Sequence, residues 1–216
     1  MADTSQASTV LFAGRSPKAI ALFFILTAMV LAADLGVKAW SFRTVAGTPV
    51  VLTDLAASNP PAFWQQYPHD AKVVMPKVLN LRLTANTGAV FGLGKGQRWV
   101  FIVVSAVATG AIGLLFYRSP RTFWVLHVAL ALILAGALGN LYDRWHYAAV
   151  RDMLHMLPGV HLPFGFSWPG GLTEVWPWIF NIADVALMWG VGLVLLVTFF
   201  VKEPSSSRVV KGQSHG

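Results

Sequence analysis

The chain lacks cysteine and has few charged residues. None of its 216 residues is cysteine, and Asp, Glu, Lys and Arg together make up 12%. The absence of cysteine excludes disulfides, thiol catalysis and cysteine-ligated zinc. A typical soluble domain has about 25% charged residues, whereas this chain is 56% hydrophobic. The composition therefore predicts a membrane protein, and the length predicts a single membrane domain covering residues 1–216.

A basic run is also missing. The net charge is +7, yet the 16 Lys and Arg residues are scattered between apolar segments. A scattered basic surface on a membrane protein favours contact with anionic phospholipid headgroups. We therefore expect membrane phospholipid around the protein and no nucleic-acid partner.

Four apolar segments are long enough to cross a bilayer, which takes about 20 mostly apolar residues. They cover residues 19–40, 99–117, 122–142 and 178–201, approximately. The first is open to a second interpretation, as a cleaved signal peptide, because small residues in "MVLAAD" lie near its end. A polar tail precedes it, however, and Asp34 and Lys38 continue the helical pattern. The predicted fold class is an all-α membrane protein with four transmembrane helices.

The positive charges predict the topology. The N-terminal tail, the connector "RSPR" and the C-terminal tail are denser in Lys and Arg than the two long connections. The positive-inside rule places both termini and this connector in the cytoplasm, and both long connections outside. Residues 203–216 are polar and predict a disordered cytoplasmic tail.

The two outer connections differ in character. Residues 43–97 contain "KVLNLRLTAN", whose alternating leucines predict a half-buried strand, and "TPVVLT", which is rich in β-branched residues. A Pro-rich loop with aromatic anchors is expected at residues 58–68. This connection predicts a small extracytoplasmic β-sheet on the membrane surface. Residues 145–177 are rich in Gly, Pro and Trp, and predict an irregular surface flap whose aromatic residues suit the headgroup layer.

Polar side chains gather near one end of the apolar spans. The spacing Asn-x-x-Asp occurs twice, as Asn140 and Asp143 in the third span and as Asn181 and Asp184 in the fourth. If the fourth helix begins near Ile179, Asp184 lies roughly 7 Å below the outer surface. Further polar candidates near this face are Asp34, Asn86, Arg144 and Asp152. Ionisable residues at membrane depth are functional candidates.

Paired carboxyl groups favour one chemistry. Two neighbouring carboxyl groups repel when both are charged, so one keeps its proton and the other is ionised. The ionised group takes a proton from water and the neutral group donates to a carbonyl, which is general acid–base peptide hydrolysis. Other polar residues have structural interpretations: Asp34 and Lys38 as an ion pair, and Asn140 and Asn181 as interhelical hydrogen-bond donors. The histidines lack the spacing of a metal site, so no metal is expected.

Two other functions stay open on the residues alone. A small proton-coupled transporter would use Asp34, Asp143 and Asp184 as relay sites. The second span offers only Ser105 and Thr109 as polar residues, however, and the acids gather near one face. A noncatalytic membrane chaperone is the other alternative, and it would tolerate the loss of either carboxylate.

Four motifs in order carry a family resemblance: "DLGVK", "NTGAVF", "GALGNLYDR" and "FNIAD". With them the chain resembles the bacterial lipoprotein signal peptidases (signal peptidase II), four-helix aspartyl proteases of the inner membrane. Leu35 stands where that family usually has glutamine, Val90 where it has alanine, and Arg151 where it has an apolar residue. The segment between Asp152 and Asp184 is also longer than usual.

The resemblance implies the catalytic pair Asp152 and Asp184, acting on a water without a cofactor. It implies that the substrates are prolipoproteins, cut before a diacylglyceryl-modified cysteine near the outer face of the inner membrane. Its supporting residues map to Asn86, Asn140, Asp143, Arg144 and Asn181, and Asp34 and Lys38 would stabilise the first helix. The cation Arg151 next to Asp152 in sequence predicts that Asp152 is the more anionic partner.

Overall fold

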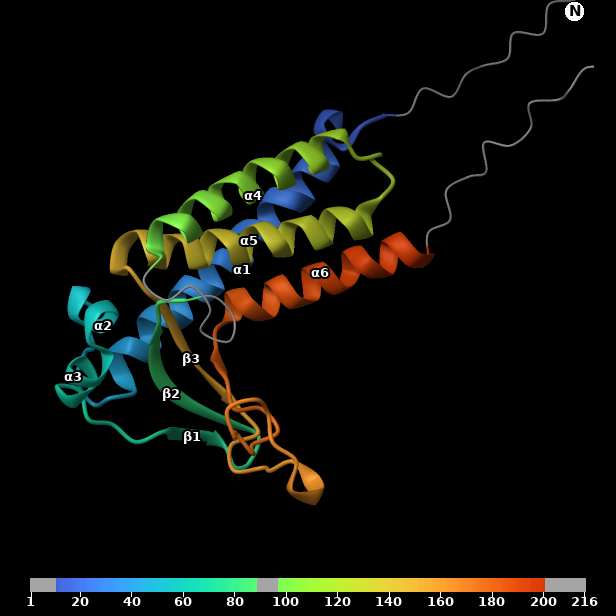
Figure 1. The fold of residues 1–216 in the computed structure, drawn as a ribbon. Coiled ribbons are helices and arrows are strands. Elements are labelled where there is room, and N and C mark those ends of the chain that lie inside the picture. The colour runs from blue at the N-terminus through green and yellow to red at the C-terminus, as the bar shows by residue number, and fades with distance from the viewer. Residues whose placement is uncertain (1–10, 89–96, 201–216) are drawn as a thin grey trace, which may run out of the picture.

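The computed structural model describes residues 11–88 and 97–200 (Figure 1). The predicted tail at 203–216 and the departure at Val90 lie outside the described residues. Four long helices form a bundle: α1 (Pro17–Thr44), α4 (Arg98–Arg118), α5 (Trp124–Tyr147) and α6 (Ile182–Phe200). Each is long and apolar enough to cross a membrane. The predicted fold class is confirmed.

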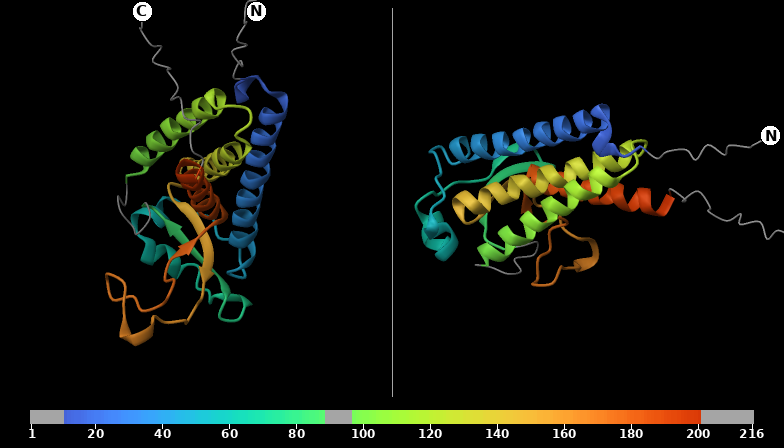
Figure 2. Two further views of the ribbon diagram at one scale, coloured as in Figure 1. Left: turned by 90° about the vertical axis from the view of Figure 1, so that its right-hand side faces the viewer. Right: turned by 90° about the horizontal axis from the view of Figure 1, so that it is seen from above.

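Helix α5 lies at the centre of the bundle. It packs against α1, α4 and α6 (Figure 2), and it is the most buried of the four helices. The face of α5 that packs against α6 needs a small residue at Gly136. A Cβ at that position would overlap the carbonyl oxygen of Ala183 on α6. Small residues allow two helix backbones to approach closely within a membrane. The polar residues at the end of α5 therefore face neighbouring helices.

The start of α6 differs from the prediction. The helix begins at Ile182, and the preceding Ile179–Phe180 forms the short strand β4. Pro177 lies just before this strand, and Asn181 caps the helix through its side chain, as described below. Asp184 is therefore in the first helical turn, closer to the end of the bundle than the apolar run suggested.

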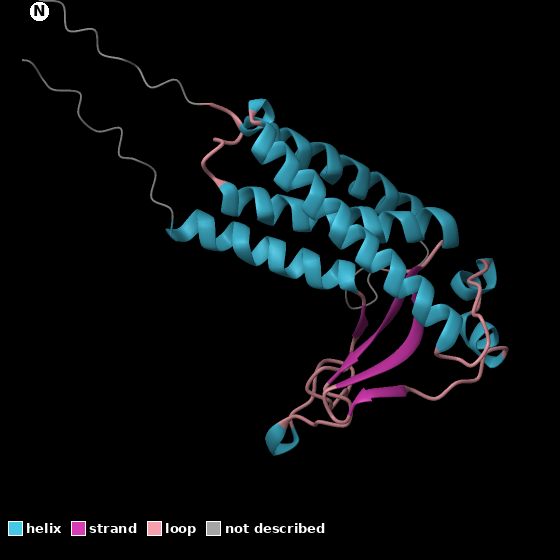
Figure 3. Cartoon of the chain, turned by 180° about the vertical axis from the view of Figure 1, so that it is seen from behind, coloured by secondary structure: helices cyan, strands magenta, loops and turns pink. Residues whose placement is uncertain are grey.

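A four-stranded antiparallel sheet lies at the end of the bundle away from residues 11 and 200 (Figures 1 and 3). Its order is β1 (Lys72–Met75), β2 (Leu79–Asn86), β3 (Val150–Met156) and β4. The predicted alternation in β2 is confirmed, with Leu81 and Leu83 both buried. The sheet also takes β3 from residues 145–177, which the sequence predicted to be an irregular flap, and β4 from the start of the predicted fourth span. The flap therefore comprises residues 157–178, between these two strands.

Two predictions for the first connection are wrong. Residues 48–53 form no strand; Val50 and Leu52 are instead buried in the core beneath the sheet. The expected loop at 58–68 contains the helix α3 (Pro60–Gln65), which follows the short helix α2 (Asp54–Ser58). The Asn59 side chain accepts a hydrogen bond from the Ala62 amide at 3.3 Å, and proline is well tolerated in a first helical turn.

The sheet is joined to the bundle by an apolar core. Its buried members are Phe42, Val50, Leu52, Ala56, Phe63, Leu81, Leu83, Ala149 and Met153. They come from the end of α1, the first connection, β2, β3 and the turn before β3, so the sheet is packed against the bundle rather than tethered to it. This packing fixes β3 beside the first turn of α6.

Candidate active site

The two predicted catalytic aspartates come from different parts of the fold. Asp152 lies on β3 and is 1% exposed, whereas Asp184 lies in the first turn of α6 and is half-buried. Two asparagine side chains connect them. Asn181 donates from Nδ2 to Asp152 Oδ1 at 2.6 Å, and Asn140 donates from Nδ2 to Asp184 Oδ1 at 2.9 Å. Asn181 Nδ2 also donates to Asn140 Oδ1 at 3.1 Å.

Asn181 and Asp184 form a reciprocal cap at the start of α6. The Asn181 side chain accepts from the Asp184 amide at 3.0 Å, and the Asp184 Oδ2 accepts from the Asn181 amide at 3.1 Å. This is the capping-box arrangement, in which the residue before the helix and the third helical residue satisfy each other's backbone N–H groups. The Asn-x-x-Asp spacing thus fixes the Asp184 carboxylate against the backbone.

Asp152 is held neutral by its surroundings. Burial raises the pKa of the Asp152 carboxyl to about 8, and the neighbouring charge of Asp184 raises it further; hydrogen bonds from Asn181 and Asn86, and the charge of Lys38, oppose the rise. A carboxyl group with this pKa is mostly protonated at neutral pH. Burial and the neighbouring carboxylate therefore favour the protonated form of Asp152.

The expectation that Arg151 keeps Asp152 ionised is wrong. The Arg151 side chain donates to Asp143 Oδ1, from Nε at 3.1 Å and from Nη2 at 2.7 Å, and lies over the Tyr147 ring. Successive side chains on a strand point to opposite faces. Neighbours in sequence on β3 are therefore separated in space, and the guanidinium compensates a different carboxylate.

Asp143 links α5 to the start of β3. It is fully buried, accepts the Arg151 amide at 2.9 Å, and lies 3.4 Å from Lys38 Nζ. Its charge is thus balanced by two cations, one from β3 and one from α1. These contacts fix the backbone one residue before Asp152, so Asp143 positions the pair without contacting it directly.

The predicted ion pair of α1 is confirmed. Lys38 Nζ lies 2.7 Å from Asp34 Oδ2, and both side chains are buried. Each also reaches the site: Lys38 donates to Asn140 Oδ1 at 3.1 Å, and Asp34 Oδ1 accepts the Ala183 amide in the first turn of α6 at 2.9 Å. Because Lys38 occupies the Asn140 oxygen, the Asn140 amide group is turned towards Asp184.

Arg144 does not pair with its neighbour Asp143. Its Nη2 donates to the Gly88 carbonyl at 3.1 Å, and its guanidinium lies 4.9 Å from the centre of the Phe101 ring. It thus fixes the backbone that follows Asn86, which itself hydrogen-bonds to Asp152. The sequence did not single out Arg98, which donates from Nε to the Arg144 carbonyl at 2.8 Å and also to that of Trp145. A single arginine at the start of a helix gives no sequence pattern from which hydrogen bonds to the end of another helix could be predicted.

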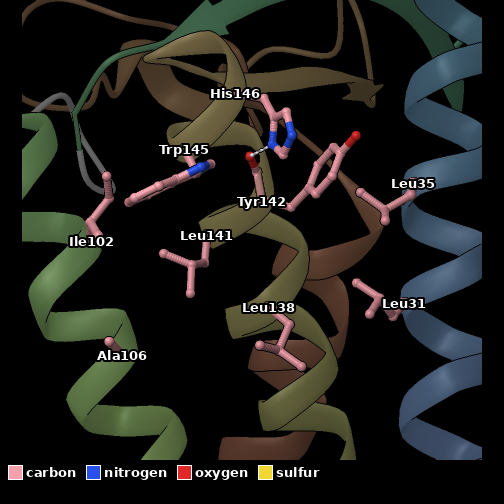
Figure 4. Close-up of a pocket in the computed structure, with 9 residues that line it drawn as sticks. All are labelled: Leu31, Leu35, Ile102, Ala106, Leu138, Leu141, Tyr142, Trp145 and His146. Carbon is pink, nitrogen blue, oxygen red and sulfur yellow. Dashed lines mark hydrogen bonds between the residues drawn. The ribbon is translucent and has the colours of Figure 1, made fainter.

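An apolar groove between α1 and α4 lies apart from the carboxylates. It is lined by Leu31, Leu35, Ile102, Ala106, Leu138, Leu141, Tyr142, Trp145 and His146 (Figure 4). Helix α6, with Asp184, lies behind α5 in this view. The groove is therefore a lipid-facing surface and not the chemical site. Within residues 11–88 and 97–200, no cluster of three or more His, Asp or Glu residues is arranged to hold a metal ion.

Four membrane-length helices and two carboxyl groups joined through asparagines, one buried and one half-buried, define a class: a polytopic membrane protein with the site of an aspartic hydrolase. Residues 26–200 match the family model described as Signal peptidase (SPase) II. The chain belongs to the signal peptidase II family, whose members are membrane aspartic peptidases.

Relatives in several bacteria agree with this assignment. The chain is 38% identical over 130 residues to a lipoprotein signal peptidase of Latilactobacillus sakei. The aligned residues cover 60% of this chain and 75% of that protein. This chain is 39% identical over 123 residues to one of Shouchella clausii, covering 57% and 70%. A bacterial membrane enzyme solved by the in meso method at 2.3 Å resolution has a similar fold, with a TM-score of 0.60 and 24% identity over 88% of this chain and 96% of that one.

Proposed function

We propose that the protein is an endopeptidase that removes signal peptides from prolipoproteins, cleaving before a cysteine that carries diacylglycerol. The observation that supports it most is the pair Asp152 and Asp184, held through two asparagines where the sheet meets the bundle. The names of the relatives, lipoprotein signal peptidases, supply the substrate class. A lipid-anchored peptide reaches the end of a transmembrane bundle without leaving the bilayer.

The two carboxyl groups divide the chemistry. Asp184 takes a proton from a water, and the oxygen of this water attacks the scissile carbonyl carbon. The neutral Asp152 donates its proton to the carbonyl oxygen as the tetrahedral intermediate forms. When the C–N bond breaks, the proton on Asp184 passes to the leaving amine, and Asp152 recovers its proton from the intermediate. No cofactor takes part in these steps.

The surrounding residues orient this pair. Asn140 and Asn181 fix the carboxylate oxygens that they bind, and Asn86 adds a hydrogen bond to Asp152. Arg144 and Asp143 fix the two backbone segments that lead to Asn86 and Asp152. Lys38 and Asp34 connect α1 to this network.

The membrane orientation completes the proposal. Both termini lie in the cytoplasm of a bacterial cell, and the sheet, the flap and the site lie at the outer face of the inner membrane. The density of Lys and Arg in the short segments supports this orientation.

Cleavage of a lipidated precursor peptide by the purified protein in detergent tests the function. We expect Asp152→Asn and Asp184→Asn to keep the wild-type helical content and to lose cleavage by at least a thousandfold, since each removes one of two groups that act as a unit. Asp70→Asn, an exposed aspartate outside the site, is the matched control and keeps full activity.

The same assay separates the alternatives. A transporter or a chaperone leaves the precursor uncut in the wild type. Full activity of either site variant removes that residue from the mechanism.

A further inference from the structure

The flap between β3 and β4, residues 157–178, has an exposed tip among the residues that the structure describes. The tip is the short 3₁₀ turn Pro163–Gly165, and the side chains of Phe164 and Phe166 are 94% and 65% exposed. Their ring centres lie 6.4 Å apart, nearly perpendicular. Large apolar side chains exposed together in this way mark a contact surface for a membrane or a partner.

The flap is held in shape from its base. Glu174 accepts hydrogen bonds from the Gly159 amide and from His155, each at 3.0 Å, and its carbonyl accepts from Trp168 Nε1 at 3.0 Å. The Leu162 amide donates a hydrogen bond to the Thr173 carbonyl at 2.8 Å and closes the loop above this base. The tip therefore presents its two rings from a braced hairpin and does not fold them back onto the sheet.

The position of the flap indicates what covers the tip. When α6 is viewed nearly end-on (Figure 2, left), the flap lies to the side of the helices and not over their end. In Figure 1 the flap lies below the first part of α6 and apart from it, and in the right view of Figure 2 it lies to one side of this part of the helix. Because α6 is one of the membrane-spanning helices, the space beside its first turns is the boundary layer of the bilayer.

The composition of the flap agrees with this location. Residues 156–173 contain no Asp, Glu, Lys or Arg, although this segment is a loop. A loop surrounded by water normally carries charged residues, whereas aromatic and apolar side chains are enriched at the level of the lipid headgroups.

We propose that the flap tip inserts Phe164 and Phe166 into the lipid headgroup layer beside the bundle. The tip is then a second membrane contact, formed by the sheet end of the molecule and independent of the four spans. It fixes the sheet, and with it β3, at a constant height relative to the bilayer surface.

The absence of cysteine allows a direct test with single-cysteine variants. Phe164→Cys, and separately Phe166→Cys, is labelled with a small fluorophore, and the protein is placed in lipid nanodiscs so that both faces meet the buffer. The control is Gln65→Cys on α3, an exposed position at the far end of the sheet region. Quenching is measured with iodide in the buffer, and with lipids that carry a nitroxide high or low on the acyl chain.

We expect the label at 164 or 166 to be quenched by the shallow nitroxide, and to be at least threefold less accessible to iodide than the label at 65. Equal iodide accessibility at all three positions, with no lipid quenching, overturns the proposal. Protection from iodide that appears only after precursor peptide is added also overturns it, because the substrate and not the lipid then covers the tip. Neither readout depends on cleavage, so the proposal stands or fails apart from the proposed function.

Discussion

The spacing Asn-x-x-Asp occurs twice in this protein and has a different structural role each time. Asn181 and Asp184 satisfy each other's backbone amides where a helix begins. Asn140 and Asp143 have the same spacing inside α5, and their side chains reach different partners: Asn140 contacts Asp184, whereas Asp143 contacts Arg151. The Asn-x-x-Asp motif therefore identified residues of the site, but it did not predict the contacts that each residue makes.

The raised pKa of Asp152 predicts an alkaline limit to activity. In the proposed mechanism Asp152 must be protonated to donate to the substrate carbonyl. Its pKa is raised from 3.8 to about 8, so the donor is present at neutral pH and is lost as the pH rises through 8. We expect kcat/KM for the lipidated precursor to fall about tenfold per pH unit above this value. A rate that stays constant well above pH 8 contradicts the assignment of Asp152 as the acid.

Because Asp34 and Lys38 form a buried ion pair in α1, we expect the substitution of Asp34 to reduce the amount of folded protein. We do not expect it to remove a catalytic group. Asp34→Ala leaves Lys38 with a cationic Nζ and one fewer partner, and it removes the acceptor for the Ala183 amide. Breaking a buried charge pair in this way destabilises a protein by about 3–5 kcal/mol. We expect a lower yield of folded protein in membranes, measured by size-exclusion chromatography, whereas exposed Asp70→Ala has the wild-type yield. Normal expression of an inactive Asp34→Ala protein contradicts the structural role.

The close contact between α5 and the helices beside it depends on glycine. A Cβ on Gly139 would overlap the Asp34 carboxylate and meet the Cβ of Ala183. On α4, by contrast, a Cβ on Gly113 would meet open space. The same substitution therefore has different physical consequences on two helices of one bundle.

We expect Gly139→Ala to lower the unfolding temperature and reduce cleavage, because Asp34 must move away from the first turn of α6. Gly113→Ala is the matched control and leaves both quantities unchanged. Thermal unfolding of the purified proteins in one detergent measures the difference. Equal unfolding temperatures for the two variants indicate that α5 and α6 do not need the close approach.

The sequence predicted the elements of the bundle better than those of the sheet. Apolar runs predict membrane helices well because every backbone group in a bilayer must be satisfied within the segment. Strand β3 was not predicted from the sequence. It is buried on both faces, apart from one half-buried residue and its exposed end, so it lacks the alternation of apolar and polar residues that marked β2. The role of Arg151 was mistaken for the same reason, since a residue not assigned to a strand has no predicted face.

The site belongs to neither the bundle nor the sheet alone. Asp152 comes from a strand, Asp184 from a helix, and the core that includes Phe42, Leu81 and Met153 packs the two parts together. The neutral state of Asp152 depends on burial in this junction. A protonated aspartate at neutral pH is therefore a property of the assembled molecule.

Infrared difference spectroscopy of the purified protein measures this property directly. The wild type is expected to show the C=O stretch of one protonated carboxylic acid at neutral pH, lost as the pH rises through about 8 and absent from Asp152→Asn at every pH. Persistence of that band in Asp152→Asn, or its absence from the wild type at neutral pH, would show that the two aspartates do not share a proton in this way.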